Sequence, residues 1–205
     1  MLCGTNMTDI KISNRSAILR LLHEAGAMSR KQIAARLKLT PATITVIINE
    51  LMNESILVEG NSVPNAGAVG RREVMVEISR EKYVALGLAL SQGLVKFTVV
   101  NLHGEIIHEE TFKLPEILTP EYFAETIGRQ IQLKIASYGY SENFIIGIGI
   151  TVCGVVDFAN GIILDSDGIW EEKNVPIVKM FRKQFSFPVI AANNVRSYAN
   201  AYAFL

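Results

Sequence analysis

Cationic, hydroxyl and amide side chains are gathered in the stretch SRKQIAARLKLTPATITVIINEL, residues 29–51. Lysine and arginine bind backbone phosphates, whereas hydroxyl groups, amides and threonine methyl groups can meet the edges of bases. Small residues among them would let the chain approach a duplex closely. We therefore expect this stretch to contact DNA through Ser29, Arg30, Lys31, Thr40, Ala42, Thr43, Thr45 and Asn49.

The same stretch has the pattern of two helices joined by a tight turn. Ser29 and Gln32 can form a capping box for the first helix, while Thr40 and Pro41 supply the cap and the first residue of the second. The apolar residues of the second helix share one side, at Ile44, Ile47, Ile48 and Leu51. This pattern predicts a helix-turn-helix whose second helix enters the major groove. The alternative, a helical hairpin inside a core, would not need Ser-Arg-Lys at its mouth or a polar outer face.

The segments on either side favour a winged helix. A supporting helix is predicted over residues 14–24, and Gly26 is the residue expected to stop it. Two strands separated by a Gly/Asn/Pro-rich loop are predicted within residues 56–78. Arg71 and Arg72, at the base of that loop, could contact phosphate or the minor groove. Two solvated arginines on a hairpin are an equally good interpretation of these residues taken alone.

Positive charge is concentrated at the predicted motif, although the chain of 205 residues has a net charge of zero. Residues 1–80 hold ten Lys and Arg against seven Asp and Glu, a net charge of +3, and residues 81–205 carry the balancing −3. Within residues 11–38, seven basic residues accompany one acid. Phosphate binding needs such a local excess and does not need a basic chain as a whole.

Cysteine usage and hydropathy narrow the setting of the protein. Cys3 and Cys153 form no Cys-x-x-Cys pattern, so the sequence predicts neither a disulfide framework nor a zinc site. No stretch has eighteen consecutive apolar residues, and the N-terminus lacks the features of a signal peptide. We expect a cytoplasmic protein with no membrane contact, no metal and no cofactor.

The second half of the chain has the pattern of an α/β domain. Residues 83–114 predict three strands, and residues 120–138 predict a helix with Thr119 as its cap. Residues 144–152 predict a further, buried strand.

Several segments resemble the ROK family (repressors, uncharacterised frames and sugar kinases), in particular its sugar-responsive repressors. NRSAILRLL, residues 29–51, ILVEG and GRREVMVEI are similar to the N-terminal domain of those repressors over residues 12–80. GITVCGVVDFANGIIL is similar to the family's Gly-x-Pro-Gly-x-Val-Asp region, and FPVIAANNVRSYANAY is similar to its sugar-binding strand-to-helix corner. The resemblance implies an α+β and α/β chain, with a winged helix-turn-helix in residues 1–80 and the first lobe of an actin-like ATPase domain in residues 81–205.

The resemblance also implies roles for individual residues. It implies DNA contact at Arg71 and Arg72, and binding of a sugar or sugar-phosphate effector at Asn193, Asn194 and Gly154. Both asparagines have a second interpretation as caps of the helix that follows them. For Asn193 we favour the ligand, and for Asn194 the two interpretations are equally good.

Two departures from the family pattern argue against sugar-kinase activity. A kinase of the family has Asp-x-Gly-x-Thr where this chain has Ala-Leu-Ser-Gln-Gly at residues 89–93, so the phosphate-binding loop and its Asp are missing. The catalytic base of such a kinase is the Asp of an Asn-Asp pair, and the matching residue is Asn194, whose amide cannot accept a proton. Cys153 also stands where the family has Pro. We therefore expect no enzyme activity.

The function implied by the resemblance is that of a DNA-binding transcriptional regulator. We expect a homodimeric repressor of carbohydrate-utilisation genes that is controlled by a sugar ligand. Family members have about as much sequence again beyond the position of Leu205, so we also expect a truncated second domain with one apolar face uncovered. The alternatives are a carbohydrate kinase with a fused DNA-binding domain and an interaction-only fragment.

Overall fold

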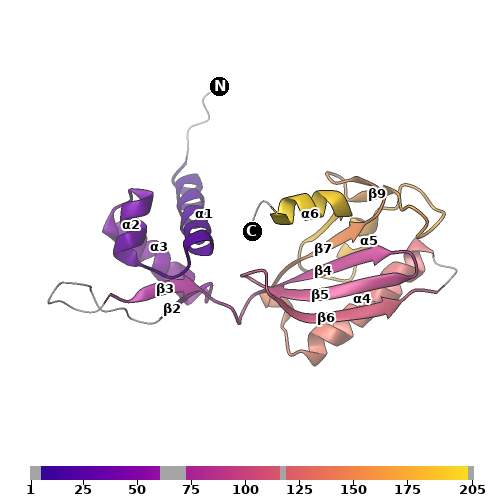
Figure 1. Cartoon of the computed structure of the whole chain (residues 1–205), viewed down its shortest axis with the longest axis horizontal. Helices are drawn as coiled ribbons and strands as arrows, with labels where there is room; N and C mark the ends of the chain where they lie inside the picture. Colours follow the sequence, from indigo (N-terminus) through magenta and orange to yellow (C-terminus); the bar gives the residue numbers. More distant parts are fainter. Residues whose placement is uncertain (1–5, 61–72, 116–118, 203–205) are drawn as a thin grey trace, which may run out of the picture. The chain divides into compact units, whose positions relative to one another are not determined.

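The computed structural model describes residues 6–60, 73–115 and 119–202, and the chain divides into two compact units, Met1–Lys82 and Tyr83–Leu205 (Figure 1). The first unit contains three helices and a small antiparallel sheet in the order β1-β3-β2. Its elements are α1 (Met7–Ala25), β1 (Met28–Ser29), α2 (Arg30–Leu37), α3 (Pro41–Asn53), β2 (Leu57–Glu59) and β3 (Met75–Ile78). This is the winged-helix arrangement that the sequence predicts.

Two features of this unit differ from the sequence prediction. Helix α1 begins seven residues before the predicted start at residue 14, because Asn6 caps it and Asp9 completes a capping box. The added turns carry exposed Ile10 and Ile12, so no buried apolar stripe marks them in the sequence. Strand β1 was not predicted, since it has two residues and is defined by its pairing with Met75 and Val76 of β3.

The three helices of the first unit enclose one small core. The buried side chains come from every helix and from the sheet, at Ile18, Leu22, Ile33, Ile44, Ile48, Leu51, Leu57 and Val76. Helix α1 is also held to α3 by ion pairs, in which Lys11 Nζ lies 2.8 Å and Arg15 Nη1 lies 3.5 Å from the Glu50 carboxylate. Burial of its apolar side therefore fixes α3 and leaves its opposite side to solvent.

The second unit is built on a five-stranded mixed sheet in the order β10-β7-β4-β5-β6. Strands β10, β7 and β4 run parallel to one another, and β4, β5 and β6 are antiparallel neighbours. The elements are β4 (Val84–Ser91), β5 (Leu94–Asn101), β6 (Ile106–Lys113), α4 (Pro120–Ser137), η1 (Glu142–Phe144), β7 (Ile145–Val152), β8 (Val155–Asp157), β9 (Ile162–Asp165), α5 (Ile177–Arg182), β10 (Val189–Asn193) and α6 (Asn194–Tyr202).

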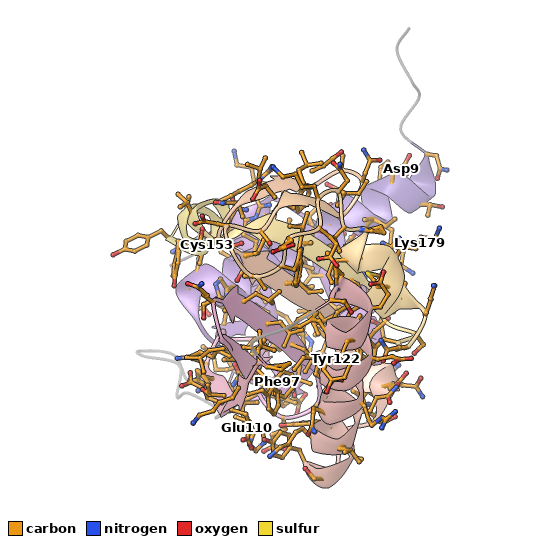
Figure 2. The ribbon with its side chains drawn as sticks, turned by 90° about the vertical axis from the view of Figure 1, so that its right-hand side faces the viewer. Asp9, Phe97, Glu110, Tyr122, Cys153 and Lys179 are labelled. Atoms are coloured by element: carbon orange, nitrogen blue, oxygen red, sulfur yellow. The ribbon has the colours of Figure 1, made fainter. Side chains whose placement is uncertain are left out.

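The core of the second unit lies between the sheet and the helices α4 and α5. Phe97 from β5, Phe123 from α4 and Phe181 from α5 are fully buried there, whereas Cys153 is exposed. Phe97 and Cys153 are labelled in Figure 2. The three strands and the helix predicted from residue 83 onward are present, and the Thr119 hydroxyl accepts a hydrogen bond from the Tyr122 N–H at 3.2 Å.

Apolar side chains of the second unit also remain at its surface. Ile146, Ile190, Val195 and Tyr198 are each more than half exposed. Among the described residues, no helix is both long and apolar enough to span a membrane.

Candidate nucleic-acid interface

Helix α2 begins with the predicted capping box. The Ser29 hydroxyl accepts a hydrogen bond from the Gln32 N–H at 3.3 Å, and the Gln32 side chain accepts one from the Ser29 N–H at 2.8 Å. Ser29 is only 3% exposed. Its side chain therefore stabilises the helix start and is almost fully buried, which weighs against the predicted contact of Ser29 with DNA.

Helix α3 begins at Pro41 with Thr40 as its cap, as the sequence predicts. The Thr40 hydroxyl accepts a hydrogen bond from the Thr43 N–H at 3.2 Å, and the two hydroxyl oxygens lie 2.9 Å apart. Thr43 is half-buried. The two hydroxyl groups assigned from the sequence to bases or phosphates thus share a hydrogen bond with each other, and that of Thr40 also caps the helix.

The solvent side of α3 is a narrow crest formed by Ala42, Val46 and Asn49, which are all exposed. Successive residues of a helix turn by about 100°, so these three share one line directly opposite the buried Ile44 and Ile48. Val46 is the residue at the middle of this crest, and we add it to the candidate contacts that the sequence indicated.

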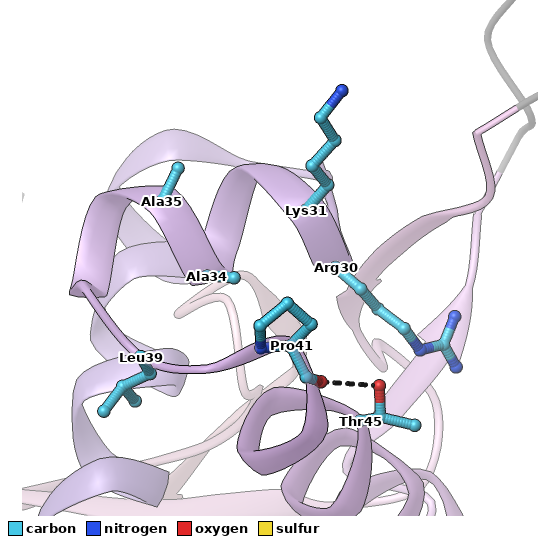
Figure 3. A pocket seen from close by; sticks show the side chains of 7 residues that line it. All are labelled: Arg30, Lys31, Ala34, Ala35, Leu39, Pro41 and Thr45. Carbon is cyan, nitrogen blue, oxygen red and sulfur yellow. Dashed lines mark hydrogen bonds between the residues drawn. The ribbon is translucent and has the colours of Figure 1, made fainter.

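The two flanks of the crest face the other two helices. On one flank Glu50 pairs with Lys11 and Arg15 of α1. On the other flank Thr45 faces α2, and its hydroxyl donates a hydrogen bond to the Pro41 carbonyl oxygen at 2.8 Å (Figure 3). The Thr45 methyl group points away from that carbonyl oxygen, and Thr45 as a whole is exposed.

A shallow groove of about 480 Å³ separates α2 from the start of α3 (Figure 3). Its floor is apolar and two cations stand at its rim; the lining residues are Arg30, Lys31, Ala34, Ala35, Leu39, Pro41 and Thr45. A groove with this lining suits the sugar-phosphate backbone of a duplex, because deoxyribose presents C–H groups and phosphate presents negative charge.

Arg30 connects three elements of the motif. Its Nη2 lies 3.5 Å from Asn49 Oδ1 on the crest, 3.4 Å from Met52 Sδ and 3.8 Å from Glu59 Oε1 on β2. The side chain is 28% exposed. The guanidinium therefore lies beside the crest, and its long contacts leave donors able to bind phosphate.

Ion pairing reduces the positive charge that is available for DNA. Lys11 and Arg15 pair with Glu50 of α3, and Arg15 also pairs with Glu54 directly after that helix. The hydrogen bond from Arg15 holds the pKa of the Glu54 carboxyl below its usual value. The count of seven basic residues in residues 11–38 thus overstates the binding charge.

Other cations of the first two helices and of the turn after α2 have a distant acidic partner or none among the described residues. Arg20, Arg36 and Lys38 form no ion pair within the parts of the chain that the structure describes, and Lys31 is 86% exposed with its Nζ 4.0 Å from Glu73. Arg71 and Arg72 lie outside the described residues, so their predicted contact with DNA stays a prediction.

The predicted ligand residues of the second unit meet where β10 ends and α6 begins. Asn193 Nδ2 donates to the Gly154 carbonyl oxygen at 2.6 Å, and Asn193 Oδ1 accepts from the N–H groups of Val195 at 2.9 Å and Arg196 at 3.4 Å. Asn193 therefore caps α6 and ties it to the loop after β7. Both ends of its amide are occupied, which weighs against our preference for a ligand role.

Asn194 and Gly154 also have local structural roles. Asn194 Nδ2 donates to Cys153 Sγ at 2.9 Å, and its Oδ1 accepts from the Val195 N–H at 2.8 Å. Gly154 has a φ of +136°, and a Cβ on it would overlap the carbonyl oxygen of Asp165. Residues 89–93, which replace the family's phosphate-binding motif, form a hairpin in which Ser91 pairs with Leu94.

Comparison with known proteins identifies both units. The model of the ROK family matches residues 86–205, and a winged helix-turn-helix DNA-binding model matches residues 13–58. The chain belongs to the ROK family. This result confirms the predicted fold class, a winged helix-turn-helix followed by the actin-like fold of ROK proteins.

Two curated proteins that are similar to this chain are named as a transcriptional regulator and as a repressor. This ROK chain is 28% identical over 196 residues to the DNA-binding transcriptional dual regulator NagC of Escherichia coli strain K12, covering 96% of this chain and 47% of NagC. It is 25% identical over 195 residues to the xylose repressor of Caldicellulosiruptor bescii, covering 95% of this chain and 48% of that protein. The chain spans about half the length of the curated relatives that it matches.

A solved structure has the same fold over nearly the whole chain. The crystal structure of a ROK family transcriptional regulator, a homolog of the E. coli MLC protein, matches with a TM-score of 0.75 and 25% identity. The match covers 94% of this chain and 48% of that one.

Proposed function

We propose that this ROK chain is a transcriptional repressor that binds operator DNA through the crest of α3 and the cationic rim of the α2–α3 groove. The observation that carries the proposal is the exposure of Ala42, Val46 and Asn49 on one line of α3, directly beside Arg30. A crest of small side chains can enter the major groove, and a neighbouring arginine can hold the backbone.

The repressor role is supported by the relatives and by the chemistry of the second unit. Of the two curated relatives described above, one is named as a DNA-binding transcriptional dual regulator and the other as a repressor. The amide of Asn194 cannot act as a base for phosphoryl transfer, and residues 89–93 are used in a hairpin. We therefore propose that the chain has no kinase activity, and sugar-dependent formation of ADP from ATP above the background of a purified blank would refute this.

Control by a sugar or sugar phosphate is the less supported part of the proposal. The corner formed by Gly154, Asn193 and Asn194 lies where the family resemblance implies an effector site, but its amide groups bond to the chain itself. Two or three neutral hydrogen bonds of about 1 kcal/mol each give at best millimolar affinity. We expect residues 1–205 to bind N-acetylglucosamine, glucose or xylose no more tightly than that, and micromolar binding in titration calorimetry would contradict this.

The proposal includes a homodimer that acts in the cytoplasm on operator DNA. A dimer binds two half-sites whose centres are about one helical turn apart, or a multiple of that distance. Sedimentation of the chain with a selected duplex would show whether two copies bind per operator.

The direct test is to change the crest without disturbing the fold. Ala42 is exposed in the first turn of α3, where an added acid favours the helix, so Ala42→Glu should fold normally. Repulsion from phosphate and steric exclusion from the groove should weaken binding to a duplex selected from a random pool by at least about tenfold. The matched control is Ser16→Glu, which makes the same change of charge at an exposed residue of α1.

Circular dichroism and fluorescence anisotropy would measure folding and binding of both variants. Equal binding by the wild type and by Ala42→Glu would refute the assignment of the crest to the major groove.

A further inference from the structure

Three exposed residues of α3 carry methyl groups, Ala42 and Val46 on the crest and Thr45 on the α2-facing flank, although the sequence of this region is rich in threonine. The hydroxyl of Thr43 bonds to that of Thr40, and the hydroxyl of Thr45 donates to the Pro41 carbonyl oxygen. In Figure 3 the Thr45 oxygen points at that carbonyl, and its methyl group points away from it. The hydroxyl groups are therefore engaged within the helix, and the outward chemistry of Thr45 is apolar.

Three residues then form one methyl surface. Val46 is 57% exposed and lies four residues after Ala42, so the two side chains are neighbours along the crest, with Thr45 beside them. An exposed valine on its own is common on protein surfaces. Here it stands at the centre of the helix side that the proposed function places in the major groove.

We propose that Ala42, Thr45 and Val46 form a contact surface for the C5-methyl group of thymine. Of the groups that the four bases present in the major groove, this methyl is the apolar one; the others are hydrogen-bond donors and acceptors. A surface of methyl groups gains from covering it and cannot satisfy the polar groups of the other bases. Val46 is thus a specificity-determining residue, and the proposal rests on the function proposed above.

The size of the effect follows from the area of one methyl group. Burial of a methyl or methylene group changes a binding constant about fourfold. We therefore expect a thymine covered by Val46 to be favoured about fourfold over the same base without its methyl group.

The experiment uses the whole chain and a double-stranded site selected with it from a random pool. Each thymine of the site is replaced in turn by deoxyuridine, which pairs identically and lacks the C5-methyl group. At one or two positions we expect wild-type binding to fall about fourfold. At one of those positions Val46→Ala should bind the thymine and deoxyuridine duplexes almost equally, because the variant lacks the valine methyl groups that contact the thymine. Val195→Ala is the same change at a valine of α6 that is 70% exposed, and this variant should keep the wild-type reduction in binding on deoxyuridine replacement.

The outcomes separate this inference from the function on which it rests. Enrichment of a site that is indifferent to deoxyuridine, or equal reductions in the wild type and in Val46→Ala, would overturn the thymine contact and leave the DNA-binding function standing. Failure to enrich any sequence would overturn the DNA-binding function and the thymine contact together.

Discussion

Removal of the Glu59 carboxylate should strengthen DNA binding through Arg30. The Arg30 guanidinium lies 3.8 Å from Glu59 Oε1, and both side chains are partly exposed. Such a pair contributes up to about 1 kcal/mol, so Glu59→Gln can raise the affinity for a duplex by at most about fivefold. The increase arises because the phosphate no longer competes with Glu59 for the same guanidinium, and it should appear on specific and non-specific DNA alike.

Replacement of Arg30 tests the other half of this reasoning. Each bound phosphate adds about 0.9 to the steepness of the slope of log K against log salt. A protein that binds one phosphate fewer therefore loses about 3.5-fold less affinity when the salt is raised from about 50 to about 200 mM. We expect Arg30→Gln to flatten the slope by about one unit. In the Arg30→Gln background, Glu59→Gln should have little further effect, because its partner is absent.

Fluorescence anisotropy at several salt concentrations would measure all four proteins of this cycle. Glu24→Gln is the matched control, since Glu24 is exposed and forms no ion pair among the described residues. An effect of Glu59→Gln that equals that of Glu24→Gln, or that persists without Arg30, would refute the competition between Glu59 and phosphate.

Three further predictions concern the wing and the second unit. Arg71→Ala combined with Arg72→Ala should flatten the salt slope by about one unit for each phosphate that the wing no longer binds, and an unchanged slope would remove the wing from the interface. Gly154→Ala should lower the thermal midpoint of unfolding, because its φ of +136° and the overlap of a Cβ with a carbonyl oxygen both disfavour a side chain; an unchanged midpoint would contradict this. The hydrogen bond from Lys134 at 2.6 Å, followed by one from a tyrosine, lowers the pKa of Glu110 below the ordinary 4.5. A carboxyl group whose pKa is lower in the folded than in the unfolded state stabilises the fold fully at pH values above its unfolded pKa, and this stability is lost as the pH falls through the folded pKa. Lys134→Met should therefore reduce the drop in thermal midpoint between neutral and acidic pH. An identical drop in the variant and the wild type would show that the pair adds no stability.

Local hydrogen bonds within the helix-turn-helix were predictable from the sequence because they join near neighbours. The capping box of Ser29 and Gln32 has the predicted partners, and Thr40 caps α3 as predicted; each of these contacts spans three residues. The buried side of α3 follows from helical spacing in the same way. The start of α1 was missed because its first turns carry exposed apolar residues, and a two-residue strand such as β1 leaves no periodic pattern.

Contacts between distant segments could not be predicted. Glu50 pairs with Lys11 across 39 residues, and that pair changes how much of the basic charge is free for DNA. Burial of Ser29 likewise depends on strand pairing with β3, which is remote in the sequence. In the second unit, the bond from Asn193 to the Gly154 carbonyl oxygen also spans 39 residues, so the sequence alone left ligand binding and helix capping as open alternatives.

The hydrogen bonds that make α3 begin at Pro41 also determine what the helix can recognise. Counted by composition, residues 40–49 contain three threonines and one asparagine, which favours hydrogen bonding to base edges. Thr40 and Thr43 use their hydroxyl groups at the helix start, and Thr45 bonds back to the preceding turn, as threonine within helices tends to do. The threonine hydroxyl groups of the first turns therefore form hydrogen bonds within the protein, and exposed Val46 lies beside exposed Ala42 and Thr45. A helix that appears polar in sequence can thus contact DNA through its methyl groups.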